Sequence, residues 1–110
     1  MNTRFSYLYR DASNYKKYSE VIFSGSLKFE QLLPFLKDKT FFIPSEIGLD
    51  DLQGNEWSFD DHVWHEIENI QPTPNTPTVN IKAMQVLERF KVAYKDGWNE
   101  YAVMKRKGLL

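Results

Sequence analysis

The sequence predicts an α+β fold: a small, mostly antiparallel sheet of three to four strands with one crossover helix, followed by a C-terminal helical segment. Three observations support this prediction. Short segments alternate apolar and polar residues, longer segments repeat apolar residues at helical spacing, and a Pro/Thr-rich stretch precedes the last of these. For 110 residues we expect a single domain with an α/β core over 4–71, a connector over 72–79 and a helical segment over 80–107.

The predicted strands follow from period-two alternation. Phe5, Tyr7 and Tyr9 alternate with other residues and therefore share one face of the first strand. The cluster at 11–14 is rich in Asp, Ser and Asn, which favour turns, so a hairpin with a moderately long connection is expected after this strand. The strands predicted in this way are residues 4–10, 21–24, 41–43 and 62–70.

The predicted helices follow from apolar stripes. Residues 26–36 carry such a stripe, with Ser26 as a candidate N-cap and Pro34 expected to kink or shorten the helix. A second helix is expected over 80–96, ended by Gly97, and similar spacing beyond the glycine predicts a further short helix.

The composition excludes several classes of function. The chain has no Cys, so disulfides, thiolate zinc sites and cysteine nucleophiles are excluded together. No apolar run is long enough for a signal peptide or a membrane span, and no Gly-rich loop could cradle a phosphate. We therefore expect a cytoplasmic protein that needs no cofactor.

The charges are segregated along the chain. The net charge is −1, but residues 1–42 carry +3, residues 43–71 carry −8 without any Lys or Arg, and residues 72–110 carry +4. Such blocks either pair across the fold or present an acidic face to a partner. Aromatic anchors within charged surroundings are typical of binding surfaces. The binding candidates in the acidic block are Trp57, Phe59, Asp60, Asp61 and Trp64.

Two histidines lie close together in the acidic block. His62, His65, Glu66 and Asp61 are ligand types for zinc, manganese or iron. On a strand, however, His62 and Glu66 share one face and His65 points to the other, and the spacing differs from the zincin pattern. We therefore expect no metal site, with His65 turned inward and His62 solvated.

A second cluster surrounds the first predicted turn. Arg10 and Lys16 could hold an anion, or a neighbouring cation could activate Tyr15. The alternative is that Arg10 and Asp11 end the strand and pair with each other or with the turn. The catalytic candidates are Arg10, Asp11, Tyr15, His62, His65 and Glu66.

The aromatic face of the first strand permits a different interpretation. Phe5, Tyr7 and Tyr9 with flanking Arg4 and Arg10 are similar to the platforms on which sheets stack single-stranded RNA. A slightly acidic chain is not typical of nucleic-acid binding, and aromatic stripes usually face a core.

The ordered segments YLYRDASNYK (7–16), VIFSG (21–25), FIPSEIGL with DL (42–52) and DHVWHE (61–66) resemble a family of short bacterial proteins without a known activity. The resemblance covers about residues 4–71 and implies a bacterial, cytosolic origin. The positions that it singles out are Arg10, Asp11, Asn14, Tyr15, His62, Trp64, His65 and Glu66.

The sequence therefore predicts a non-enzymatic protein-interaction or regulatory module, which could form a homodimer through its C-terminal helix. The first alternative is a small metal-dependent hydrolase or nuclease that uses Asp61, His62, His65 and Glu66. The second alternative is single-stranded RNA binding on the aromatic strand face.

Overall fold

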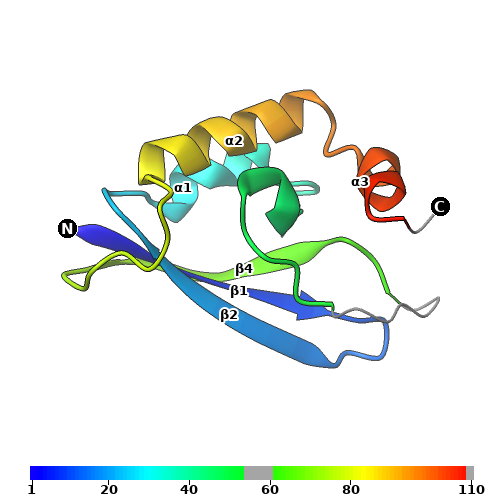
Figure 1. Ribbon diagram of the computed structural model, residues 1–110, viewed down its shortest axis with the longest axis horizontal. Helices are drawn as coiled ribbons and strands as arrows, with labels where there is room; N and C mark the ends of the chain where they lie inside the picture. The colour runs from blue at the N-terminus through cyan, green and yellow to red at the C-terminus, as the bar shows by residue number, and fades with distance from the viewer. Residues whose placement is uncertain (54–60, 109–110) are drawn as a thin grey trace.

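The computed structural model describes residues 1–53 and 61–108 (Figure 1). Four strands form one antiparallel sheet in the order β2-β1-β4-β3, and the helices lie on one side of it, which confirms the predicted α+β class. The elements are β1 (Asn2–Arg10), β2 (Lys16–Phe23), α1 (Phe29–Leu32), the 3-10 turn η1 (Leu33–Phe35), β3 (Phe41–Phe42), the 3-10 turn η2 (Pro44–Ile47), β4 (His65–Thr73), α2 (Ala83–Lys95) and α3 (Glu100–Arg106).

The core lies between the sheet and α2. Phe5, Tyr7 and Tyr9 of β1 are at most 2% exposed, so the predicted apolar face of this strand is confirmed. The ring of Phe42 joins the two layers, with centroid distances of 5.8 Å to Phe5 and 5.5 Å to Phe90. Because these rings are buried in the core, they present no open face on which RNA bases could stack.

The hairpin between β1 and β2 is tighter than predicted. β2 begins at Lys16, not at residue 21, and Asp11 N–H donates to Tyr15 O across the turn at 3.0 Å. Asn14 has the left-handed φ of 66° that such a turn uses. Residues 16–20 lie on an edge strand with polar side chains, so no alternation marks them as a strand.

The helix expected over 26–36 is short. Pro34 ends α1 after Leu32, and the chain continues as η1, as the missing N–H of proline predicts. Ser26 is not the N-cap: Lys28 takes this position, and its N–H donates to Gln31 Oε1 at 2.8 Å.

The strand expected over 62–70 begins later and runs further. β4 starts at His65 and includes Pro72, where β1 is the only neighbouring strand in the described part of the chain, so the missing N–H is tolerated. The rest of the predicted connector is fixed to the sheet, because Asn2 Nδ2 donates to Asn75 O at 2.9 Å and Thr78 pairs with Ile22.

Both C-terminal helices pack on their own chain. α2 buries Ala83, Val86 and Phe90, and α3 buries Val103, which confirms the further short helix after Gly97. Two ion pairs join α3 and the residue that follows it to the acidic block: Arg106 with Glu46, and Lys107 with Asp51. No helix within residues 1–53 and 61–108 is long and apolar enough to span a membrane.

Candidate functional site

His65, at the start of β4, is fully buried and fully hydrogen-bonded. Its Nε2 accepts the backbone N–H of Leu52 at 3.0 Å, so Nδ1 carries the proton and donates to Val63 O at 3.1 Å. Burial lowers the pKa of His65 to about 4, so the ring is neutral near pH 7. The prediction of an inward, satisfied His65 is confirmed.

His62 lies in a turn that precedes β4. Its Nδ1 accepts the backbone N–H of Trp64 at 3.0 Å, so Nε2 carries the proton and donates to Arg10 O at 2.8 Å. The expectation that His62 is solvated, on the opposite face of one strand from His65, is therefore wrong. Both imidazoles contact the ring of Tyr9, at centroid distances of 5.0 Å and 5.2 Å.

This arrangement leaves neither imidazole with a free lone pair for a metal ion. A metal would have to displace the backbone N–H of Trp64 or of Leu52. Among the described residues, no group of three or more His, Asp or Glu is placed to hold a metal ion. Nearby, Tyr9 Oη donates to Asp61 Oδ1 at 2.5 Å, and burial together with this carboxylate raises the pKa of the Tyr9 hydroxyl.

The structure brings three of the catalytic candidates together. Arg10 Nε donates to Glu66 Oε2 at 3.0 Å and Arg10 Nη1 to Asn14 Oδ1 at 2.9 Å, while the carbonyl of Arg10 accepts from His62. Asp11 does not join them, because its carboxylate accepts the backbone N–H of Tyr15 within the turn. These contacts tie the β1–β2 turn to the start of β4, and they leave the Tyr15 side chain 76% exposed.

The candidates for partner binding in the acidic block divide into two groups. Trp64 is half-buried beside Phe41, at a centroid distance of 6.5 Å, and Asp61 accepts from Tyr9 as described above. Trp57, Phe59 and Asp60 lie outside the described residues. A binding surface at this place stays a prediction.

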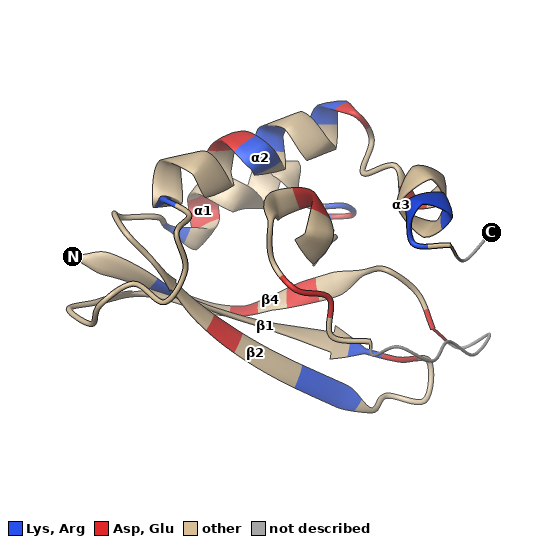
Figure 2. Ribbon diagram, in the orientation of Figure 1, with Lys and Arg blue, Asp and Glu red and all other residues tan. Residues whose placement is uncertain are grey.

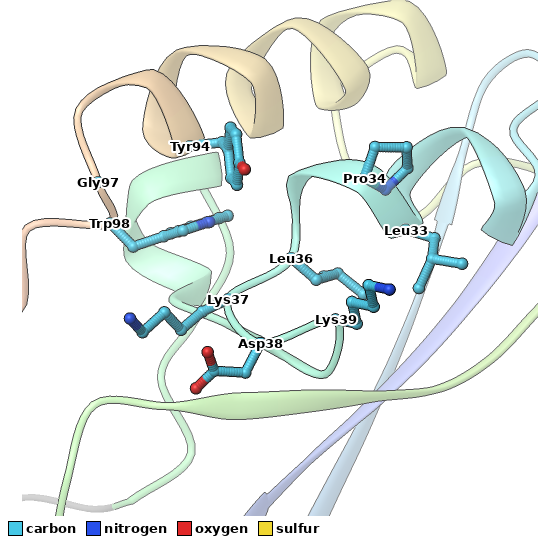
Figure 3. Close-up of a pocket in the computed structure, with 9 residues that line it drawn as sticks. All are labelled: Leu33, Pro34, Leu36, Lys37, Asp38, Lys39, Tyr94, Gly97 and Trp98. Atoms are coloured by element: carbon cyan, nitrogen blue, oxygen red, sulfur yellow. The ribbon is translucent and has the colours of Figure 1, made fainter.

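A groove that the sequence did not reveal lies between the end of α2 and the chain after η1 (Figure 3). Its volume is about 780 Å³. Figure 3 shows the rings of Tyr94 and Trp98 on one side, with Leu36 and Lys39 on the other. The residues that line this Trp98 groove are Leu33, Pro34, Leu36, Lys37, Asp38, Lys39, Tyr94, Gly97 and Trp98.

The C-terminal end of α2 positions Trp98. Trp98 N–H donates to Ala93 O at 2.8 Å and Gly97 N–H donates to Tyr94 O at 2.9 Å, which together form a Schellman motif. Gly97 has the expected positive φ of 75°, but Trp98 follows it with a φ of 48°. The indole is fixed by a bond from Nε1 to Phe35 O at 2.7 Å.

The opposite wall is a tight turn. Asp38 and Lys39 have φ values of 52° and 60°, as in a type I′ turn, and Thr40 N–H donates to Lys37 O at 3.0 Å. Two bonds between Lys37 and Phe41 close the turn. Glycine, asparagine and aspartate favour such a conformation, so Asp38 suits the turn but Lys39 gives no signal of it in the sequence.

The charge near the groove is positive. Lys37 and Lys39 line it together with a single carboxylate, that of Asp38. Lys91 Nζ lies 5.9 Å from the ring centroid of Phe35, and this ring contacts that of Tyr94 at 5.9 Å. Lys91 is also paired with Glu88 at 3.7 Å, so the positive charge comes from Lys37 and Lys39 against Asp38. The groove therefore combines apolar walls with a small positive net charge.

The fold and these sites define a four-stranded antiparallel α+β domain with a hydrogen-bonded histidine cluster and a basic, aromatic groove. No family model, no curated protein and no solved structure matches the chain. The resemblance to a family of short bacterial proteins stays an expectation from the sequence.

Proposed function

We propose that the chain is a non-enzymatic protein-interaction module of the bacterial cytoplasm, and that the Trp98 groove binds an acidic segment of a partner protein. The observation that carries the proposal is the strained backbone of the groove. Asp38, Lys39 and Trp98 all line it with positive φ. Each such residue costs on the order of 1–3 kcal/mol, and strain of this kind concentrates at binding sites.

The chemistry of the walls supports a peptide with an apolar anchor and carboxylates. A volume of about 780 Å³ lies in the range of roughly 300–1,000 Å³ that ligand sites occupy. Leu33, Pro34 and the half-exposed ring of Tyr94 offer a large side chain an apolar surface. Leu36 and Trp98 lie beneath them and are at most 4% exposed. The indole N–H of Trp98 already donates to Phe35 O. The carboxylates of a bound peptide would therefore be recognised by Lys37 and Lys39.

The histidine cluster supports the non-enzymatic part of the proposal. A general base needs a lone pair directed at its substrate, and a metal-dependent hydrolase needs open ligands. In His62 and His65 every ring nitrogen is bonded to the backbone, and Glu66 is paired with Arg10. These bonds give the cluster a structural role in joining β1 to the start of β4.

Selection from a displayed random peptide library tests the proposal directly. We expect the wild-type chain to enrich peptides that combine Asp or Glu with Leu, Phe or Trp. Their affinity is expected to fall at least about tenfold for the double variant Lys37→Glu/Lys39→Glu, because attraction becomes repulsion. The matched control is the double variant Lys17→Glu/Lys28→Glu, which makes the same charge change at two exposed lysines that do not line the groove.

The proposal is wrong if no such peptides are enriched, or if the enriched peptides bind the groove variant and the wild-type chain equally well. Circular dichroism of each variant verifies that a loss of binding is not a loss of fold.

A further inference from the structure

The outer edge of β2 is only partly covered. Ile22 N–H donates to Thr78 Oγ1 at 2.9 Å and Ile22 O accepts from Thr78 N–H at 3.0 Å, so the backbone groups of Ile22 point away from β1. The direction of the backbone groups alternates along a strand. The N–H and C=O groups of Lys16, Tyr18 and Glu20 therefore also point outward, away from β1. Within the described residues, none of these outward groups has a backbone partner. Such an edge is a template for another strand.

The charges along this edge are ordered. Figure 2 shows a basic segment near the start of β2 and an acidic segment further along it. Lys16 and Glu20 lie at equal distances in sequence on either side of Tyr18, whose side chain is 57% exposed. All three side chains belong to the sheet face opposite that of Phe5. A two-fold axis at Tyr18 would therefore bring unlike charges together.

We propose that two copies of the chain associate by antiparallel pairing of β2 with β2, with Tyr18 opposite Tyr18 of the second copy. In this register Lys16 faces Glu20 of the second copy, twice in each dimer. The outward N–H and C=O groups of all three residues gain partners, and the two sheets join into one continuous sheet.

Other registers are disfavoured by the same contacts. If the two-fold axis passes through Lys16, Lys17 or Glu20, that residue lies directly opposite its own copy, and the like charges are destabilising. A centre at Ser19 places Lys16 opposite Ile22, whose backbone groups are already bonded to Thr78. The register centred on Tyr18 avoids both problems.

This surface differs from the one that the sequence suggested for a homodimer. The apolar side of α3 is occupied by its own chain, since Val103 is fully buried in the core. The β2 edge also lies outside the residues that line the Trp98 groove, so self-association and peptide binding can fail independently.

Sedimentation velocity over a range of protein concentrations tests this proposal. We expect a concentration-dependent dimer for the wild-type chain. Lys16→Glu and Glu20→Lys should each weaken it about tenfold or more, because each replaces two attractive pairs by two repulsive ones. The combined Lys16→Glu/Glu20→Lys variant should bind its second copy at least about threefold more tightly than either single variant, since it restores unlike charges across the interface. It does not regain the full wild-type affinity, because Glu20→Lys also replaces the ion pair of Glu20 with Arg4 of its own chain, at 3.6 Å, by two like charges.

Two further variants separate the edge from general effects of charge. Lys17→Glu makes the same charge change on the opposite face, where Ser19 of the second copy would be its neighbour, and should leave the dimer intact. Tyr18→Pro removes an outward N–H without removing a bond to β1, and should give a monomer. A wild-type chain that stays monomeric at every concentration, or a combined variant that associates no more tightly than either single variant, overturns the proposal. Thermal unfolding of each variant shows that it is folded.

Discussion

His65 Nε2 accepts the backbone N–H of Leu52 at 3.0 Å, and this bond holds the chain after η2 against the start of β4. The bond requires a neutral ring with its proton on Nδ1, which donates to Val63 O. Protonation of His65 would place two N–H groups against each other. The contact is therefore sensitive to pH.

We expect the free energy of unfolding to decrease as the pH falls from about 6.5 to 4. The pKa of His65 is lowered to about 4 in the folded chain, and the ordinary value of 6.5 applies to the unfolded chain. Between these values the unfolded state binds the extra proton, so acid favours unfolding, by about 2 kcal/mol at pH 5 and about 3 kcal/mol at pH 4. Denaturant unfolding at pH 7, 6, 5 and 4 measures this loss.

The variant His65→Gln is the control for this pH dependence. Its amide can accept from Leu52 and donate to Val63 but does not titrate near pH 5. The difference in pH dependence between the two proteins isolates the imidazole from the carboxylates. Parallel curves would show that His65 does not cause the loss.

We expect no stoichiometric binding of Zn²⁺ or Mn²⁺ at neutral pH. Both nitrogens of His62 and of His65 are engaged with the backbone, so a metal would have to break these bonds. Titration calorimetry and metal analysis of the purified protein measure binding. One equivalent of metal that is lost in His62→Ala or His65→Ala would instead support the metal-dependent hydrolase.

Trp98→Phe is expected to lower the free energy of unfolding by about 1–3 kcal/mol. The substitution removes the donor to Phe35 O and leaves a smaller ring beside Phe90. Chemical denaturation measures the change. Tyr101→Phe, at a side chain that is 66% exposed, should change stability by no more than about 0.5 kcal/mol.

Lys39→Gly is expected to increase the free energy of unfolding by about 1 kcal/mol, because glycine adopts a φ of 60° without the clash of a Cβ atom. The same variant should weaken peptide binding, since it removes a cation from the groove. Lys37→Gly, at a position without a positive φ, should instead be destabilising. A lower stability of Lys39→Gly would argue against strain in this turn.

Periodic patterns predicted the elements that have one buried and one exposed face. β1 alternates between buried and less buried residues except at Leu8, which is buried between Tyr7 and Tyr9. α2 with Gly97 has both its apolar stripe and its stop signal in the sequence. Residues 16–20 carry no such pattern, because an edge strand with few buried side chains needs none. The start of β4 was misplaced because a ring nitrogen of His62 satisfies Trp64 N–H, a local contact for which histidine has no recognised preference.

The candidate site could be predicted only in part. The inward position of His65 followed from alternation along its strand. The Trp98 groove did not, because it depends on positive φ at Lys39 and Trp98 and on contact between segments about sixty residues apart. Neither residue type favours that conformation, so only the packed structure reveals it.

The ion pairs Arg106–Glu46 and Lys107–Asp51 have a consequence for the groove, because Trp98 lines the groove and lies just before α3. Added salt weakens the more exposed pair, Arg106–Glu46, more than the mostly buried Lys107–Asp51. It should therefore let α3 open more often and expose its amides to hydrogen exchange. A ligand that binds the groove only while Trp98 is in place should in turn slow this exchange, since linkage acts equally in both directions. Ionic strength would then tune the affinity of the groove without any change in the residues that line it.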